Sequence, residues 1–188
     1  MRLTQVYALI PLVAFGICSL QPAASVRRAP GAAQTAATPE MDRLAKALAG
    51  DWETVETMER GRFFPNGGSR HGIVHARLSA GGNVLIYEVH SDGSAGKLDG
   101  FHTIWWDKTT KVYYFFACFN GAHPCRMRGT AHWEASTFVN DYEEKIDGKT
   151  TRWRDTFVIT PTSHTLTASM NTDHNSWQTV ITTKATRR

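Results

Sequence analysis

Residues 138–157 read FVNDYEEKIDGKTTRWRDTF, and they contain the clearest indication of strand pairing in the chain. Its centre, Asp147-Gly148, is a dipeptide that two-residue β-hairpin turns favour, because a type I′ turn needs a positive φ at both central positions. If Ile146 lies opposite Lys149, every further pair between the two strands is fixed. The stretch therefore predicts a hairpin whose side-chain pairs can be checked one by one.

The expected register separates the two faces of this hairpin. One face gains pairs of opposite charge and the other gains aromatic and polar pairs, and both kinds stabilise antiparallel strands. The pairs are Phe138–Phe157, Asn140–Asp155, Asp141–Arg154, Tyr142–Trp153 and Glu143–Arg152. A slip of one residue would lose all of them together, so we expect this register.

The rest of the chain after Gly50 has the same strand-like character. Short runs rich in Val, Ile, Thr and aromatic residues are separated by Gly, Asn and Asp, as in antiparallel sheets. Candidate strands begin near Trp52, His71, Val84, Gly100, Val112, Cys125, Phe138, Thr151, His164 and Trp177. Their regular spacing, with six Trp in the chain, predicts an all-β, antiparallel up-and-down barrel of about 8–10 strands.

One short helix is expected before the first strand. Thr38 can cap it, Pro39 suits its first position, and Gly50 can end it. Met41, Leu44, Ala45 and Leu48 recur at helical spacing. This apolar face suits a plug packed against the sheet.

A second hairpin is expected to turn at Asn120-Gly-Ala-His123. With Phe119 facing Pro124, three further pairs follow. They are Cys118–Cys125, Phe116–Met127 and Tyr114–Gly129. Directly opposed cysteines lie within bonding distance, so we predict a Cys118–Cys125 disulfide, with two buried free thiols as the alternative.

Several landmarks resemble a known family. Leu48-Ala-Gly-Asp-Trp52 places a Gly-x-Trp directly after the helix, and residues 100–113 and 129–134 add further aromatic motifs. Together they resemble a bacterial lipocalin-like family, the one numbered 1579 among domains of unknown function. The resemblance covers residues 41–183 and implies a calycin-type barrel in which Gly50 and Trp52 are structural. It implies no established activity. True lipocalins also pack a basic residue of the last strand over this Trp, and Lys184 or Arg187 could fill that place.

The N-terminus predicts export. Met1-Arg2 precedes an apolar run, Val6–Leu20, and Ala23 and Ser25 offer a cleavage site. We expect a signal peptide over residues 1–25, a disordered linker over 26–39 and the barrel domain over 40–188. The destination is the periplasm or the outside of the cell, and an uncleaved membrane anchor is the alternative.

The candidate ligand site comes from the strands around residues 102–127. If Asp107 lies opposite Lys111, the inward side chains of these strands form one mostly apolar wall. That wall consists of His102, Ile104, Trp106, Tyr114, Phe116 and Met127. With a second wall of Tyr142 and Trp153, it would line either a cavity or a filled core, and the sequence favours neither.

Asp155 is expected on the aromatic face of the first hairpin. A buried carboxylate costs free energy unless it is paired, so Asp155 marks a structural network or a ligand contact. We prefer the structural interpretation and keep Asp155 in the candidate site.

These features predict an exported, monomeric binding protein for a small apolar or aromatic ligand. The alternatives are an isomerase or hydrolase using His102 or Asp155 as acid or base, and a packed-core envelope protein without a small ligand. No catalytic residue is assigned, and no His-x-His, Cys-x-x-Cys or His-Glu-x-x-His pattern indicates a metal. No cofactor is predicted, with haem on His102 or His132 as the alternative. The net charge is +4, and the basic residues are spread out, which argues against a nucleic-acid partner. Once the signal peptide is cleaved, we expect no stable membrane insertion.

Overall fold

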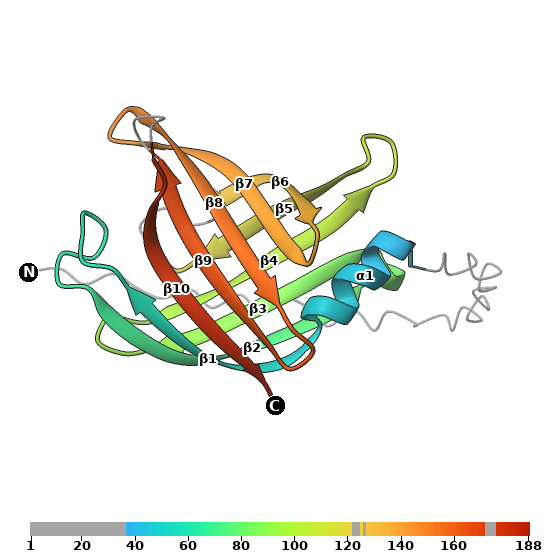
Figure 1. Cartoon of the computed structure of the whole chain (residues 1–188), viewed down its shortest axis with the longest axis horizontal. Helices are drawn as coiled ribbons and strands as arrows, with labels where there is room; N and C mark the ends of the chain where they lie inside the picture. The colour runs from blue at the N-terminus through green and yellow to red at the C-terminus, as the bar shows by residue number, and fades with distance from the viewer. Residues whose placement is uncertain (1–36, 122–124, 126, 172–175) are drawn as a thin grey trace, which may run out of the picture. The chain divides into compact units, whose positions relative to one another are not determined.

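Ten strands form a closed antiparallel barrel in which sequence neighbours pair and the first strand closes against the last (Figure 1). This computed structural model describes residues 37–121, 125, 127–171 and 176–188. The elements are α1 (Pro39–Leu48), β1 (Gly50–Met58), β2 (Gly68–Ser79), the short 3₁₀ turn η1 (Ala80–Gly82), β3 (Val84–Asp92), β4 (Leu98–Asp107), β5 (Val112–Phe119), β6 (Met127–Glu134), β7 (Thr137–Ile146), β8 (Lys149–Ile159), β9 (Ser163–Asn171) and β10 (Gln178–Arg187). The expected all-β, up-and-down barrel is confirmed, and the largest error in a strand start is His71 against Gly68.

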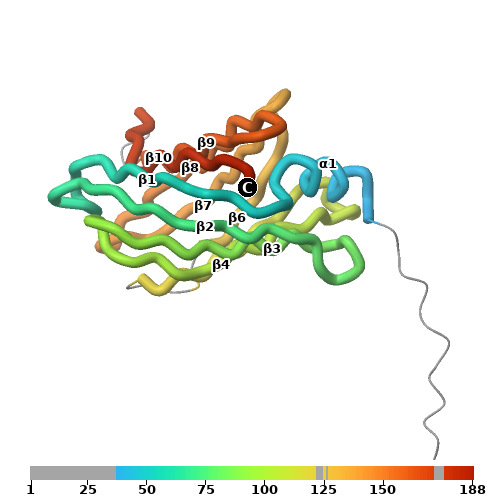
Figure 2. The backbone as a smooth tube through the Cα atoms, turned by 90° about the horizontal axis from the view of Figure 1, so that it is seen from below, coloured from blue at the N-terminus to red at the C-terminus, as the bar shows by residue number. Residues whose placement is uncertain are grey.

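Helix α1 lies across one end of the barrel (Figure 2). The Thr38 hydroxyl accepts a hydrogen bond from the Met41 backbone N–H at 3.3 Å, which caps the helix. Met41, Leu44 and Leu48 are fully buried and join the main hydrophobic cluster. The helix therefore closes this end, which we call the closed end. It stops at Ala49, one residue before the expected Gly50.

The Gly-x-Trp motif is built into the closed end. Trp52 is fully buried, and its indole N–H donates to the Leu48 carbonyl at 2.9 Å. The Arg187 guanidinium lies 4.3 Å from the Trp52 ring centre and donates to the Ala49 carbonyl at 2.8 Å. Gly50 has a φ of 131°, and a Cβ there would collide with the Arg187 guanidinium. Of the two basic candidates, Arg187 therefore covers Trp52, whereas Lys184 is exposed.

The β7–β8 hairpin has the expected register throughout. Ile146 pairs with Lys149, and all the charged, aromatic and polar pairs follow from it. The outward pairs form ion pairs, with Arg154 Nε 2.8 Å from Asp141 and Arg152 Nε 3.2 Å from Glu143. The two-residue turn thus permits only one register between these two strands.

The β4–β5 hairpin is shifted by one residue from the expected register. Asp107 pairs with Val112 instead of Lys111. Lys111 adopts a left-handed φ of 55°, and its N–H donates to the Asp107 carbonyl at 2.8 Å. Lys111 therefore belongs to the turn and is unavailable to the ladder.

The β5–β6 hairpin is shifted in the same way. Phe116 pairs with Arg128 instead of Met127, and Met127 pairs with Ala117. Cys125 lies in the loop with a left-handed φ of 60°, and part of the expected turn, residues 122–124, lies outside the described residues. The Cys118–Cys125 disulfide is present, although the cysteines are not a directly opposed strand pair.

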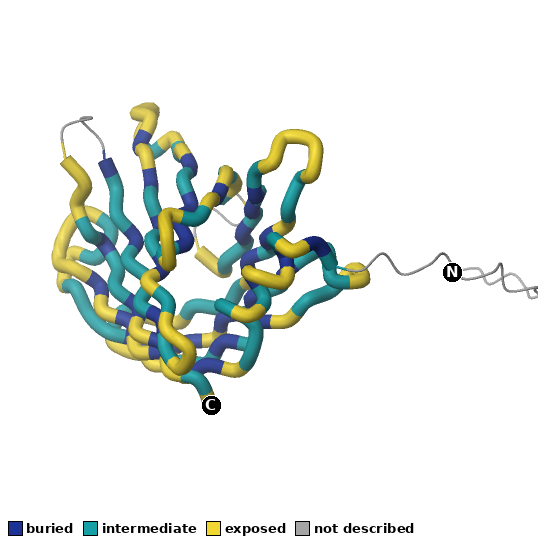
Figure 3. The backbone as a smooth tube through the Cα atoms, turned by 45° about the vertical axis from the view of Figure 1, so that its right-hand side comes forward, coloured by how far each residue is buried: buried dark blue, intermediate teal, exposed yellow. Residues whose placement is uncertain are grey.

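Buried and exposed positions alternate along the strands (Figure 3). On β1 the buried side chains are Trp52, Thr54, Glu56 and Met58. At the other end of the barrel, which we call the open end, the β1–β2 loop places Phe63 against Trp153 with ring centres 5.3 Å apart. An ion pair between Arg62 and Asp147 joins the same loop to the β7–β8 turn.

Candidate functional site

Two neighbouring pairs of buried side chains on the inward face of β7 and β8 can form hydrogen bonds. Asn140 and Asp155 lie opposite each other at 0% and 3% exposure. Tyr142 and Trp153 form the next inward pair toward the turn and stack with ring centres 6.0 Å apart. The structure therefore brings Tyr142, Trp153 and Asp155 together on one wall of the barrel.

The surroundings of Asp155 disfavour its negative charge. Burial raises the pKa of this carboxyl to about 7, the Asn140 amide opposes the shift, and the charge on Asp141 adds to it. A carboxyl with this pKa exists in both protonation states near neutral pH. Asp155 can therefore donate or accept a hydrogen bond toward the interior.

The second wall differs from the expected one. His102, Ile104 and Trp106 share the inward face of β4, but the shifted register pairs them with Ala117, Phe115 and Tyr113. The prediction that Tyr114 and Phe116 face inward is therefore wrong. On the outer face, Tyr114 stacks on Trp105 at 5.9 Å and Phe116 lies 6.5 Å from Phe101, measured between ring centres. Met127 pairs with Ala117 and packs against the main core.

The two histidines considered for haem have different surroundings. His102 is buried, with its ring 5.8 Å from Tyr87 and 5.1 Å from Phe119. Burial lowers the pKa of His102 to about 4, so its imidazole is neutral at physiological pH. His132 is on the outer surface, where its Nε2 lies 2.9 Å from Glu134. Only His102 faces the interior.

Sequence reasoning missed the polar side chains of β1, β2 and β3. Glu56 and Arg70 form an almost fully buried ion pair at 2.7 Å, and the Ser91 hydroxyl donates to Glu56 at 3.1 Å. The Tyr87 hydroxyl lies 3.0 Å from His164 Nε2. The signal was the period-two alternation of β1, which places Glu56 on the same face as Trp52.

Seven buried side-chain atoms have no hydrogen-bond partner among the described residues. All belong to residues on the inward face of the barrel. The atoms are Thr54 Oγ1, Arg70 Nε, Asn140 Nδ2, Asn140 Oδ1, Trp153 Nε1, Asp155 Oδ1 and His164 Nδ1. An unpaired buried polar atom costs about 1–3 kcal/mol of folding free energy. Water or a ligand in the interior would supply the missing hydrogen bonds.

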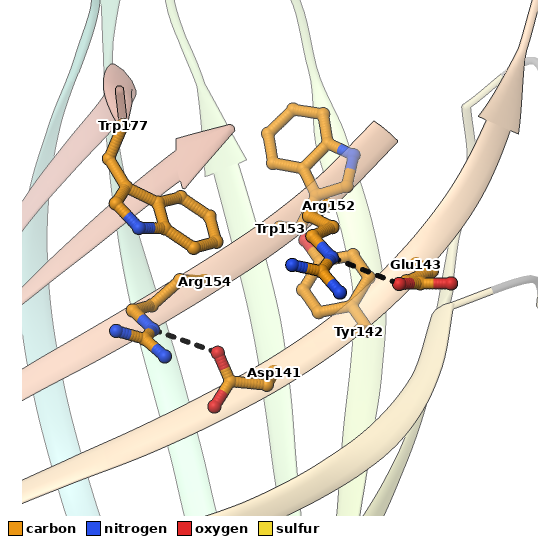
Figure 4. Close-up of a pocket in the computed structure, with 7 residues that line it drawn as sticks. All are labelled: Asp141, Tyr142, Glu143, Arg152, Trp153, Arg154 and Trp177. Atoms are coloured by element: carbon orange, nitrogen blue, oxygen red, sulfur yellow. Dashed lines mark hydrogen bonds and ion pairs between the residues drawn. The ribbon is translucent and has the colours of Figure 1, made fainter. Parts of the chain in front are cut away.

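A surface pocket of about 300 Å³ lies at the β7–β8 hairpin (Figure 4). The exposed Trp177 ring lies 5.0 Å from the Arg154 guanidinium, and the two outward ion pairs of the hairpin lie beside it. The lining residues are Asp141, Tyr142, Glu143, Arg152, Trp153, Arg154 and Trp177. Because each charge here already has a partner of opposite sign, the pocket shows no preference for a charged ligand.

The described residues hold no cluster of three or more His, Cys, Asp or Glu side chains suited to a metal ion. In the same part of the chain, no helix has the length and apolar character that crossing a membrane requires.

Comparison with known proteins supports the architecture. A crystal structure of Rv2717c from M. tuberculosis matches with a TM-score of 0.56 and 14% identity, over 81% of this chain and 99% of that one. The chain has a lipocalin-like, calycin-type fold. An S-type phycobiliprotein lyase, CPES from Guillardia theta, matches with a TM-score of 0.49 and 11% identity, over 79% of this chain and 90% of that one. No family model and no curated protein matches the sequence, so the resemblance to the family numbered 1579 is not confirmed.

Proposed function

We propose that this chain is an exported binding protein that holds one small molecule inside its barrel. The observation that carries the proposal is the set of seven unpartnered polar atoms on the inward faces. They come from β1 and β2 as well as from β7, β8 and β9, which together with β10 form one continuous side of the barrel, so they line that side of the interior. If only the protein's own side chains filled the interior, each of these polar atoms would stay buried without a hydrogen bond, which costs folding free energy.

The chemistry of the wall defines the ligand class. Tyr142 and Trp153 offer aromatic surface, and Asn140 and Asp155 offer hydrogen-bonding groups beside it. Glu56 and Arg70 neutralise each other, so they leave no net charge for an ionic ligand to match. The ligand we propose is therefore a small, mostly apolar or aromatic molecule with at least one neutral polar group.

Fluorescence titration tests this proposal. We expect saturable quenching of Trp emission by at least one member of a panel of hydrophobic aromatic ligands that includes haemin. Asn140→Ala and Asp155→Asn should weaken that binding by about tenfold, the effect of losing one buried hydrogen bond. Glu143→Gln, on the outer face of β7, the strand that carries Asn140, is the matched control and should bind like the wild type. The absence of a saturable response to every compound would overturn the proposal.

Asp155 also supports an alternative function, in which residues of the barrel interior catalyse an isomerisation or hydrolysis. Its carboxyl is buried, faces the interior, and has a pKa close to neutral pH, as a general acid or base requires. Turnover of a bound ligand that Asp155→Asn abolishes without loss of binding would favour this alternative. Equal ligand stability with and without the protein would exclude it for that ligand.

The proposal also includes export of the chain and its membership in the family numbered 1579. The expected signal peptide over residues 1–25 lies outside the described residues, as does the expected linker over 26–39 up to residue 36. At the end of that linker range, Thr38 caps α1 and Pro39 begins it, so these two residues belong to the folded part. N-terminal sequencing of protein recovered from the periplasm or medium should begin at Val26. Recovery with Met1 in place would contradict cleavage. Membership in the family numbered 1579 is proposed from the Gly50 and Trp52 motif and the aromatic motifs of residues 100–113 and 129–134. The position of Arg187 over Trp52 is instead the feature expected of true lipocalins.

A further inference from the structure

A second pocket lies where β5 and β6 separate at the closed end. The ladder between these strands holds five residue pairs in the described chain, from Tyr113–Ala131 to Ala117–Met127. Beyond Tyr113 the strands are unpaired, while β6 continues to pair with β7 as far as Glu134. A pocket of about 430 Å³ occupies this gap, and Glu40 and Arg43 of α1 line its edge.

Three aromatic side chains from three strands line this pocket: Trp106, Tyr113 and Trp133. The Trp133 indole N–H donates to the Tyr113 hydroxyl at 3.3 Å, and that hydroxyl donates to the Glu40 carbonyl at 2.8 Å. The rings of Trp106 and Tyr113 meet edge to face, with centres 4.8 Å apart. Since these contacts fix the rings before any ligand arrives, a planar molecule would meet a preorganised aromatic wall.

The charged residues at the edge favour an anion. Arg43 stacks over Trp133 at 4.1 Å and uses one guanidinium nitrogen to bind the Ala135 carbonyl. Lys111 is exposed and forms no ion pair with any described residue. Glu40 is the one acidic residue in the lining. Two permanent cations therefore face one carboxylate, and Lys111 has no competing partner.

We propose that this pocket, at the closed end of the barrel, is a second binding site, distinct from the group of unpartnered polar atoms, for a planar aromatic carboxylate. The ring system stacks against Trp106 and Trp133, and the carboxylate pairs with Lys111 at the edge. The site goes beyond the proposed interior function, because none of its lining residues belongs to the set with unpartnered polar atoms.

Calorimetric titration of the full mature chain with 2-naphthoate tests the site. We expect naphthoate to bind at least tenfold more tightly than 2-naphthylmethylamine, which carries the opposite charge on the same ring system. Lys111→Gln should weaken naphthoate binding about threefold to tenfold, and Trp106→Leu should abolish it. Lys149→Gln and Trp105→Leu, which alter an exposed lysine and an exposed tryptophan elsewhere, are the matched controls and should bind normally.

The same titration separates this site from the interior. Naphthoate binding should persist in Asp155→Asn, which alters the interior wall at a position that pairs with no residue lining the second pocket. Binding that is lost in Asp155→Asn and kept in Trp106→Leu would place the ligand against that wall and overturn the second site. Equal affinity for the carboxylate and the amine, or no binding of either, would also overturn it.

Discussion

Asp155 is a carboxyl held where its charged form is disfavoured. Its pKa is about 7 in the folded protein, against about 3.9 in an unfolded chain. The folded state therefore binds the proton more tightly, and the fold gains stability from Asp155 as the pH falls from 7 to 4. Above pH 7 the buried charge is fully destabilising.

The variant Asp155→Asn tests this cost. Because the amide cannot ionise, we expect it to be more stable than the wild type at pH 8, by on the order of 2 kcal/mol. At pH 5 the difference should shrink or reverse. Urea unfolding at both pH values measures it, with Glu143→Gln as the surface control. A loss of stability of equal size at both pH values would contradict the assignment.

Arg187 is expected to stabilise the closed end of the barrel. Arg187→Ala removes the contact with the Trp52 ring and the hydrogen bond to the Ala49 carbonyl. We expect a loss of about 2–3 kcal/mol in the free energy of unfolding. Arg188→Ala, which removes only an exposed ion pair with Glu53, should cost less than about 1 kcal/mol. Equal effects of the two variants in thermal or urea unfolding would show that Arg187 is no more than a surface residue.

Among the elements, the hairpins show what the sequence could and could not predict. Asp147-Gly148 permits one tight turn, so the wall of Asn140, Tyr142, Trp153 and Asp155 was predictable in full. The β4–β5 and β5–β6 turns are longer, and several pairings fit them equally well. Their registers depend on left-handed backbone at Lys111 and Cys125, which neither residue type indicates in advance.

The interior polar residues were missed for a related reason. A Glu or Arg in a strand ordinarily faces solvent, so neither Glu56 nor Arg70, taken alone, was expected in the interior. Their pairing joins β1 to β2, and it becomes visible only when the register of those strands is known. The polar side chains that β1 and β2 add to the interior could therefore not be predicted without knowledge of the strand pairing.

The disulfide of the β5–β6 hairpin allows a test at the level of this element. Free-thiol titration of denatured mature protein should find no reactive thiol, because Cys118 and Cys125 are bonded. Replacing both by Ser should lower the free energy of unfolding by about 2 kcal/mol, since the closed loop is short. Two titratable thiols in the oxidised protein would contradict the bond.

For the molecule as a whole, two buried histidines act against Asp155 on acidification. Burial lowers the pKa of His102 and of His164 to about 4, and the Arg187 charge adds to the shift at His164. An unfolded histidine titrates near 6.5, so their contribution is present above that pH and is lost as the pH falls to 4.

The stability lost through the two histidines exceeds the stability gained through the one carboxyl. We therefore expect the free energy of unfolding to fall between pH 6.5 and 4. Asp155→Asn should steepen this loss, and His102→Gln should flatten it, when midpoints of urea unfolding are followed across the range. His71→Gln, which alters an exposed histidine, is the control. A stability that rises steadily from pH 6.5 to 4 would contradict the balance of these groups.

The pairing of β1 with β10 has a consequence for when the chain can fold. Trp52 faces Arg187, so the first and last strands must meet before the barrel closes. Closure across so long a loop is slow, and it cannot begin until the final residues leave the ribosome. Under the proposed export, the chain would cross the membrane before it folds, and this topology holds back completion of the barrel until β10 has been made.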